Sequence, residues 1–321
     1  MRTTLETTTR PKTKHHPEPV RAANAVKTIT PASIETLLDE VLREYVDEPV
    51  DLLGIGDAES EARYRAYLKP SYLRTLQDVV AAAGSDRGGP IRVLEIGGFL
   101  GVVSITLARL GYAVTITEIP EFLACEALRT KLDRDGIGYV ACNLRDYRLA
   151  FDDDAFDVVV CCEVLEHLNF NPLPVVAEVN RVLRTGGLLY VALPNLACLD
   201  NRMRLLRGES IHNPIRDFFA QLDPNDNMIV GLHWREYTAP EVKDMLERMG
   251  FEVTRQAFVD REAPDAGKPR WSLKGRIMKR LYRHLLGVDF DNDPSLKKVQ
   301  VTFAEKREPP DTKFHFCDAT R

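Results

Sequence analysis

The sequence has no excess of basic residues and no long apolar run, and each absence narrows what the protein can be. Its 321 residues carry 43 Lys and Arg against 48 Asp and Glu, a formal net charge of −5. Proteins that hold nucleic acid over a broad surface are strongly basic, so this charge argues against nucleic acid as a partner. No apolar run approaches the roughly 18 residues that a membrane-spanning helix needs, so no transmembrane segment is expected.

Features of secreted proteins are also scarce. Six cysteines in a chain of this length, several of them inside apparent buried strands, do not form the dense framework of a disulfide-stabilised protein. Residues 1–30 are rich in Thr, Pro and Lys and contain no apolar core of a secretory signal. We therefore expect a cytoplasmic protein whose residues 1–30 form a disordered arm.

What is present is the composition of an ordinary globular protein, with 44% hydrophobic and 28% charged residues. After the arm, residues 31–88 carry two helical patterns of apolar residues and are predicted to form an N-terminal helical cap. The first pattern begins at Pro31. The second runs over residues 59–83, and its Pro70 should break or kink the helix.

Beyond the cap, strands and helices alternate over residues 89–306, which predicts an α/β fold with a doubly wound, mainly parallel sheet. The predicted strands are residues 91–96, 112–118, 137–142, 156–162, 187–193, 251–258 and 298–303. The predicted helices between them are residues 100–110, 121–134, 173–184 and 239–249. The third of these helices should stop at Thr185-Gly186-Gly187.

Two stretches interrupt this alternation and are predicted insertions, residues 196–232 and residues 259–295. Residues 307–321 are predicted to be a loose tail. Inside the second insertion, residues 271–285 place Leu and Ile on one helical stripe, with Lys and Arg outside it. A peripheral membrane contact is one interpretation of this stripe. A docked helix with a solvated basic face is the favoured one.

The most informative stretch is the turn after the first predicted strand. An apolar strand over residues 91–96 runs into a turn with four candidate contact residues, Gly97, Gly98, Phe99 and Gly101. Glycine lets the backbone turn sharply and approach a ligand without a Cβ atom in the way. A helical pattern follows at once, and a helix N-terminus at the mouth of a parallel sheet is where nucleotides usually bind.

This turn resembles the first motif of the class I S-adenosylmethionine-dependent methyltransferases, which reads acidic-x-Gly-x-Gly-x-Gly. Glu95 takes the acidic position, Gly97 and Gly101 match the first and third glycines, and Phe99 stands where the middle glycine is usual. The resemblance implies a Rossmann-like sheet of seven strands in the order 3-2-1-4-5-7-6. It also implies S-adenosylmethionine as cofactor, with Glu95 reaching its ammonium group and Gly97 and Gly98 close to its amino-acid half.

Polar residues also follow the next two predicted strands. Glu118, with Ile119 after it, ends the second strand, and its carboxylate can accept hydrogen bonds from two ribose hydroxyls. Asn143, with Leu144 after it, follows the third strand, and its amide can pair with an adenine edge. Each residue alone could belong to a surface turn. Polar residues at three successive strand ends favour a cofactor site.

Candidate groups for the chemistry follow the fourth predicted strand and precede a late helix. Glu163, Glu166 and His167 come after residues 156–162 and would share one face if the chain turned helical there. His233 comes shortly before a helix whose predicted N-cap is Thr238, and we expect it to return to the same edge of the sheet.

Three interpretations of these groups stay open. Methyl transfer requires alignment and handling of the acceptor's proton, so His167 or His233 could be the general base, with Glu163 beside it. The two carboxylates and two imidazoles could instead bind a divalent metal. They then resemble the small-RNA terminal-ribose methyltransferases, and ubiquinone-pathway O-methyltransferases carry a similar Glu-x-x-Glu-His run. In the third interpretation, Glu166 and His167 only bond neighbouring backbone.

The expected function is S-adenosylmethionine-dependent O-methylation of a small-molecule acceptor, such as a sugar, a glycan or a secondary metabolite. A metal-assisted 2′-O-methyltransferase acting on a ribose or diol is one alternative. A nicotinamide-dependent oxidoreductase is another, but it would need Gly-x-Gly-x-x-Gly, which residues 97–101 do not provide. A cofactor-binding scaffold without catalysis is the third alternative, because Phe99 and Asn143 depart from the family's usual pattern.

Overall fold

The computed structural model describes residues 29–54, 56–84, 89–222, 231–260 and 292–311, with six separate positions between residues 277 and 289. The predicted arm lies almost entirely outside the described residues. So do most of the predicted tail and most of the amphipathic segment 271–285. Among the described residues, no helix is both long enough and apolar enough to span a bilayer.

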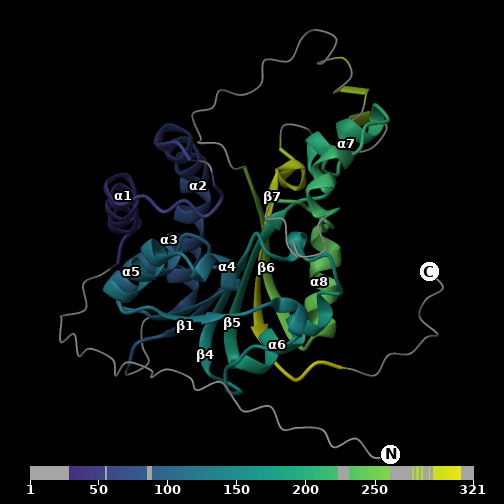
Figure 1. Ribbon diagram of the computed structural model, residues 1–321. Helices are drawn as coiled ribbons and strands as arrows, with labels where there is room; N and C mark the ends of the chain where they lie inside the picture. Colours follow the sequence, from purple (N-terminus) through teal and green to yellow (C-terminus); the bar gives the residue numbers. More distant parts are fainter. Residues whose placement is uncertain are drawn as a thin grey trace, which may run out of the picture.

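Seven strands form one sheet in the order β3-β2-β1-β4-β5-β7-β6 (Figure 1). This is the predicted order. The first five strands pair in parallel, and β7 runs antiparallel between β5 and β6. The strand bounds are β1 Arg92–Ile96, β2 Ala113–Glu118, β3 Gly138–Ala141, β4 Phe156–Cys162, β5 Leu183–Pro194, β6 Phe251–Val259 and β7 Val299–Lys306.

Helices cover both faces of the sheet and enclose one apolar core on each face (Figure 1). One face carries α1 Pro31–Asp47, α2 Ala58–Ala83, α3 Val102–Arg109, α4 Pro120–Leu123 and α5 Glu126–Arg134. The other carries α6 Leu173–Val182 and α8 Ala239–Arg248, while α7 Leu199–Leu206 lies beyond the end of β5. Short 3₁₀ helices are η1 Leu144–Asp146, η2 Leu165–His167, η3 Ile215–Leu222 and η4 Pro294–Leu296. Side chains alternate across a strand, so the adjacent Cys161 and Cys162 pack into opposite cores, as expected.

Two local predictions were wrong. Helix α6 ends at Val182, and strand β5 begins at the next residue, Leu183. The pairing of β5 with β4 is irregular at first, because Leu183 pairs with Phe156 and the next pair is Leu188 with Val158. Pairing with β4 therefore overrides the helix-stop signal. The predicted helix 121–134 is divided into α4 and α5. Of the break or kink predicted at Pro70, the break is absent, since α2 continues through Pro70. Burial of its apolar side chains in the core offsets the lost backbone hydrogen bond.

The helical cap is fixed to the sheet domain by polar contacts as well as by apolar packing. Tyr45 of α1 is buried and donates a hydrogen bond to the carbonyl oxygen of Leu100. Arg109 of α3 binds Glu44 of α1, with Nη2 to Oε2 at 2.9 Å, and binds Asp135 with Nε to Oδ1 at 2.7 Å. The cap therefore has a fixed position relative to the turn that begins α3.

Candidate functional site

The candidate cofactor residues lie along one edge of the sheet, where the parallel strands β1 to β4 end. We call this the carboxyl edge. Gly97 leaves β1 with φ of +70°, a conformation that favours glycine. Its amide donates to the carbonyl oxygen of Thr117 in β2 at 2.9 Å. The turn is thus bonded to the neighbouring strand and lies beside Glu118.

The glycines of this turn are required by packing as well as by backbone geometry. A Cβ atom on Gly97 would lie 2.7 Å from Cγ2 of Val164, in the turn after β4. One on Gly101, where φ is +74°, would lie 2.9 Å from Cδ2 of Leu132. The β1–α3 turn and the turn after β4 therefore approach one another more closely than side chains would allow.

Glu118 holds the turn through its side chain. The carboxylate is 8% exposed, and it accepts a hydrogen bond from the Phe99 amide at 2.8 Å and one from the Ile119 amide at 2.7 Å. Burial raises the pKa of Glu118, and the two backbone hydrogen bonds oppose this shift. Each oxygen accepts one of these bonds and retains capacity for a second.

Phe99 directs its ring into the protein and toward the cap. Its φ is +47°. The ring centroid lies 6.3 Å from that of Tyr64 in α2 and 5.7 Å from that of Phe122 in α4. The bulky residue at the usual glycine position therefore joins the turn to the helical cap.

The remaining cofactor candidates differ in exposure. Glu95 is 6% exposed and accepts a hydrogen bond from the hydroxyl of Ser104 in α3, and burial raises its pKa to about 7. Asn143 is exposed and caps η1, accepting from the amide of Arg145 at 3.0 Å. Leu144 begins η1 and is partly buried.

The chain does not turn helical directly after β4, so the expected common face of Glu163, Glu166 and His167 was wrong. Glu163 has a left-handed backbone with φ of +55°, and its amide donates to the carbonyl oxygen of Ala192 at 2.8 Å. Only residues 165–167 form a single 3₁₀ turn, η2. The left-handed residue therefore separates Glu163 from Glu166 and His167.

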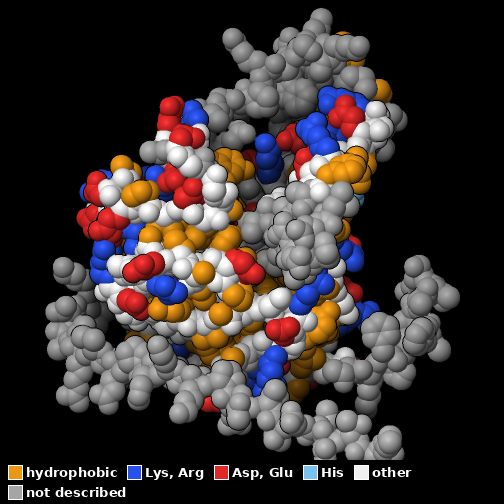
Figure 2. All heavy atoms as spheres, viewed as in Figure 1, with side chains coloured by type: hydrophobic (Ala, Val, Ile, Leu, Met, Phe, Trp, Pro, Cys, Tyr) orange, Lys and Arg blue, Asp and Glu red, His pale blue; other side chains and the backbone are white. Residues whose placement is uncertain are grey.

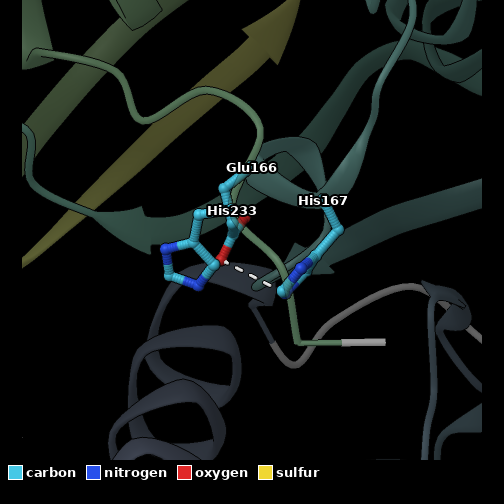
Figure 3. A group of neighbouring side chains, drawn as sticks. All are labelled: Glu166, His167 and His233. Atoms are coloured by element: carbon cyan, nitrogen blue, oxygen red, sulfur yellow. Dashed lines mark ion pairs between the residues drawn. The ribbon is translucent and has the colours of Figure 1, made fainter. Parts of the chain in front are cut away.

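Glu166, His167 and His233 do come together, and we call them the Glu-His-His cluster (Figure 3). One ligand atom from each residue lies within 4.8 Å of the others. Glu166 is fully buried, its Oε1 is 3.9 Å from Nε2 of His167, and the two imidazole centroids are 5.0 Å apart. The prediction that His233 returns to this edge is confirmed. Glu163 is not part of the cluster.

Backbone and side-chain bonds bring His233 to the cluster from far along the chain. The amide of Trp234 donates to the carbonyl oxygen of Glu166 at 2.7 Å. Nδ1 of His233 lies 2.9 Å from Oε1 of Glu236, whose other oxygen accepts from Asn201 of α7 at 2.9 Å. Glu236 and Asn201 were not predicted from the sequence. The i, i+3 spacing of His233 and Glu236 was the available signal.

The hydrogen bonds at Nδ1 determine where each neutral imidazole carries its proton. Nδ1 of His167 lies 2.9 Å from the carbonyl oxygen of Leu232, which can only accept. The proton is therefore on Nδ1, and Nε2 carries the lone pair toward Glu166. Nδ1 of His233 faces the Glu236 carboxylate, which favours the same arrangement. A histidine whose Nδ1–H bonds an acceptor presents a basic Nε2 to a proton or a metal ion.

A cavity of ≈ 590 Å³ adjoins the cluster. His233, Glu236 and Lys298 form part of its wall, together with residues of α2, of the end of β5 and of the segment that contains α7. The volume is within the usual range for small-molecule sites.

The residues of the carboxyl edge fit S-adenosylmethionine. The Glu118 oxygens have acceptor capacity for ribose hydroxyls, and the exposed Asn143 amide can reach an adenine edge. The turn at Gly97 and Gly98 presents no side chain. Glu95 is already bonded to Ser104, so a role toward the ammonium group stays a prediction.

Comparison with known proteins agrees with this geometry. Residues 94–191 match the family model described as "Methyltransferase domain". The chain is 32% identical over 119 residues to the ubiquinone biosynthesis O-methyltransferase of Xanthomonas campestris pv. campestris, covering 37% of this chain and 48% of that protein. The protein of the same name from Thiobacillus denitrificans is 29% identical over 141 residues, covering 43% and 57%. The chain thus spans about half the length of the curated relatives it matches.

Among solved structures, an S-adenosylmethionine dependent methyltransferase from Mesorhizobium loti superposes with a TM-score of 0.47 at 15% sequence identity, over 75% of this chain and 98% of that one. The family model covers β1 through most of β5, and the strand order and the glycine turn agree with it. Residues 94–191 of the sheet domain are thus similar to the class I S-adenosylmethionine-dependent methyltransferases.

Proposed function

We propose that the protein is an S-adenosylmethionine-dependent methyltransferase that methylates a hydroxyl oxygen of a small-molecule acceptor, with sugar-bearing acceptors as the preferred class. The observation that carries this proposal is the Glu-His-His cluster. It lies at the same edge as Glu118 and the glycine turn, and its His233 lines the adjoining cavity. The O-methyltransferase names of the curated relatives support oxygen as the acceptor atom.

The bound cofactor supplies a methyl group already activated on a sulfonium. Glu118 would hold its ribose, and the turn at Gly97 would lie against its amino-acid half. What the chain itself must provide is alignment of the acceptor and a place for the hydroxyl proton. Nε2 of His233 can take that proton at the cavity wall, and Glu236 then stabilises the resulting imidazolium through Nδ1.

A divalent cation at the Glu-His-His cluster is a second candidate. The donor set of one carboxylate and two imidazoles suits Zn²⁺ or Mn²⁺. Both imidazoles have hydrogen-bond acceptors at Nδ1, as metal-binding histidines usually do. An ion there would polarise the acceptor hydroxyl and lower its pKa. The role of His233 would then be to hold the ion instead of the proton.

The experiment is a release assay for S-adenosylhomocysteine with a panel of hydroxylated acceptors, preceded by titration of the protein with S-adenosylmethionine. We expect cofactor binding in the micromolar range and turnover with at least one acceptor. His233→Ala should lower kcat at least 100-fold and leave cofactor affinity within twofold. His284→Ala, an exposed histidine outside the cluster, is the matched control.

Treatment with EDTA separates the two roles of the cluster. Full activity after EDTA, with loss of activity in His233→Ala, supports the general base. Loss of activity that added Mn²⁺ or Zn²⁺ restores, together with loss in Glu166→Gln, supports the cation. Binding of NADH in place of the sulfonium would refute the proposal, and cofactor binding without turnover would favour a scaffold.

We also propose a cytoplasmic location. The five cysteines that the structure describes are all free thiols. Thiols are maintained in a reducing compartment, whereas secreted domains commonly pair them.

A further inference from the structure

The cavity beside the cluster has a basic wall that the methyl-transfer chemistry does not require. It lies between α2 and α7, and Figure 2 shows a hollow between these two helices with Lys or Arg side chains on its wall. Arg204 and Arg207 of the α7 segment and Lys298 before β7 line it. Transfer of the hydroxyl proton to His233 needs no such charge.

The acidic residues of the same cavity are already engaged. Asp200 is 3.3 Å from Nζ of Lys298, and Glu236 is bonded to His233 and Asn201. Within the part of the chain that the structure describes, no ion pair or hydrogen bond is formed by the guanidinium groups of Arg204 and Arg207. Two positive charges therefore face the cavity without a compensating carboxylate.

The arginines lie at a fixed separation from the reactive end of the cavity. Asn201 and Arg204 are three residues apart on α7, Arg207 is the C-cap of the helix, and all three line the cavity. Asn201 holds Glu236, which orients His233. At 1.5 Å per residue, Arg207 is about 9 Å along the helix from Asn201. One small molecule can therefore place a hydroxyl at His233 and an anionic group at the arginines.

We propose that the acceptor carries a phosphate group, which Arg204 and Arg207 bind while its hydroxyl lies at His233. The proposal rests on the proposed methyltransferase function and names the acceptor class of that site. Guanidinium groups bind phosphate oxygens through paired N–H donors, and two of them suit a dianion. Tyr67 of α2 faces the same cavity and gives the rest of the acceptor an aromatic surface.

The first test measures binding of inorganic phosphate by calorimetry at low ionic strength, without cofactor or acceptor. We expect the wild-type protein to bind phosphate and Arg204→Gln/Arg207→Gln to bind it at least tenfold more weakly. The control is Arg63→Gln/Arg248→Gln, which removes two charges from exposed helix faces where each arginine pairs with a carboxylate one turn away. It should bind phosphate within twofold of wild type.

Circular dichroism and thermal melting of both double variants show whether α7 remains folded. Cations also stabilise helix C-termini, and if the two arginines serve only that purpose, the melting temperature falls while phosphate affinity stays unchanged. That result overturns the proposal. Absence of phosphate binding by the wild-type protein at millimolar concentration overturns it as well.

The second test uses matched acceptors, a hexose phosphate and the same hexose without phosphate, in the S-adenosylhomocysteine assay. We expect KM for the phosphorylated sugar to be at least tenfold lower, and the arginine double variant to remove this preference. Titration with S-adenosylmethionine distinguishes the two possible failures. Cofactor binding without phosphate binding refutes only the acceptor class. Phosphate binding without cofactor binding refutes the methyltransferase function and leaves the anion site.

Discussion

At the scale of single residues, Glu118 connects the cofactor turn to β2. Its two oxygens accept hydrogen bonds from backbone amides on either side, and the carboxylate is almost completely buried. Burial by itself disfavours the charge, which is why the pKa of Glu118 is raised. A residue retained at this cost is explained best by a ligand that needs its remaining acceptor capacity.

We predict that Glu118→Gln raises the Kd for S-adenosylmethionine about ten- to hundredfold, because charge-assisted hydrogen bonds to the ribose are lost. Calorimetric titration measures the change. Glu121→Gln, an exposed carboxylate in α4 near the same edge, is the control and should change Kd less than twofold. Equal affinities for wild type and Glu118→Gln would place the ribose elsewhere.

Glu95 links protein stability to pH. Its pKa is about 7 in the folded protein because of burial, against 4.5 as the ordinary value. The folded state therefore keeps a proton that the unfolded state releases between these values. The stabilising contribution is complete below pH 4.5 and is lost as pH rises through 7, at up to ~1.4 kcal/mol per pH unit.

We predict that Glu95→Gln makes the free energy of unfolding depend less steeply on pH between 5 and 7. The amide can still accept a hydrogen bond from Ser104, but it has no proton to release. Urea unfolding of wild type and variant at pH 5 and at pH 7 tests this. Glu126→Gln on the exposed side of α5 should keep the wild-type slope, and parallel curves for wild type and Glu95→Gln would show that Glu95 is not responsible.

At the scale of elements, the site depends on two turns that touch. The β1–α3 turn carries Gly97, and the turn after β4 carries Val164, Glu166 and His167. The missing side chain at Gly97 is what allows Val164 to pack against it. The glycine turn and the Glu-His-His cluster are therefore positioned by the same contact.

We predict that Gly97→Ala lowers the free energy of unfolding by at least about 2 kcal/mol, through the positive φ and the clash with Val164. In Gly97→Ala/Val164→Ala the clash is removed and the backbone strain remains. The double variant should therefore lose less stability than the sum of the two single variants. Urea unfolding of all four proteins measures this coupling, and strict additivity would mean that the turns are independent.

The segment that carries His233 is a second element with a structural requirement. Thr238 caps α8 in a capping box with Glu241, and Tyr237 pairs with Asn195 after β5. These bonds fix the backbone at Tyr237 and Thr238, a few residues after His233. The imidazole of His233 therefore reaches the cluster from a fixed backbone.

At the scale of the whole molecule, the helical cap and the sheet domain are joined by charged groups near α3. Arg109 binds Glu44 of the cap and Asp135 after α5. Lys131 is buried, and its Nζ lies 3.1 Å from both the carbonyl oxygen of Glu44 and Oε2 of Glu48. Because Phe99 also packs on Tyr64 of the cap, the position of the cap affects the cofactor turn.

We predict that Arg109→Met lowers the free energy of unfolding by about 2 kcal/mol, since hydrogen bonds to a charged group are lost on both sides of the interface. Limited proteolysis should then cut the variant faster within residues 31–47. Arg63→Met, whose ion pair with Glu59 is exposed, is the control and should unfold like wild type. Unchanged proteolysis of Arg109→Met would show that apolar packing alone holds the cap.

The sequence determined the alternation of strands and helices, the strand order by resemblance, and the polar residue at each strand end. These features are local, because each depends on residues within a few positions and on the common direction of parallel strands. The glycine turn and Glu118 could therefore be predicted from the sequence. The end of α6 could not be predicted in this way, because the pairing of β5 with β4 outweighs the local helix-stop signal.

Only the tertiary structure decided which candidate catalytic residues meet. Glu163 and Glu166 are three positions apart, yet a left-handed backbone at Glu163 separates them. His233 is 66 residues beyond His167. The amide of Trp234 donates to the carbonyl oxygen of Glu166, Glu236 orients His233, and the two ring centroids are 5.0 Å apart. Contacts between distant segments depend on packing of the whole chain, and local residue patterns carry no record of it.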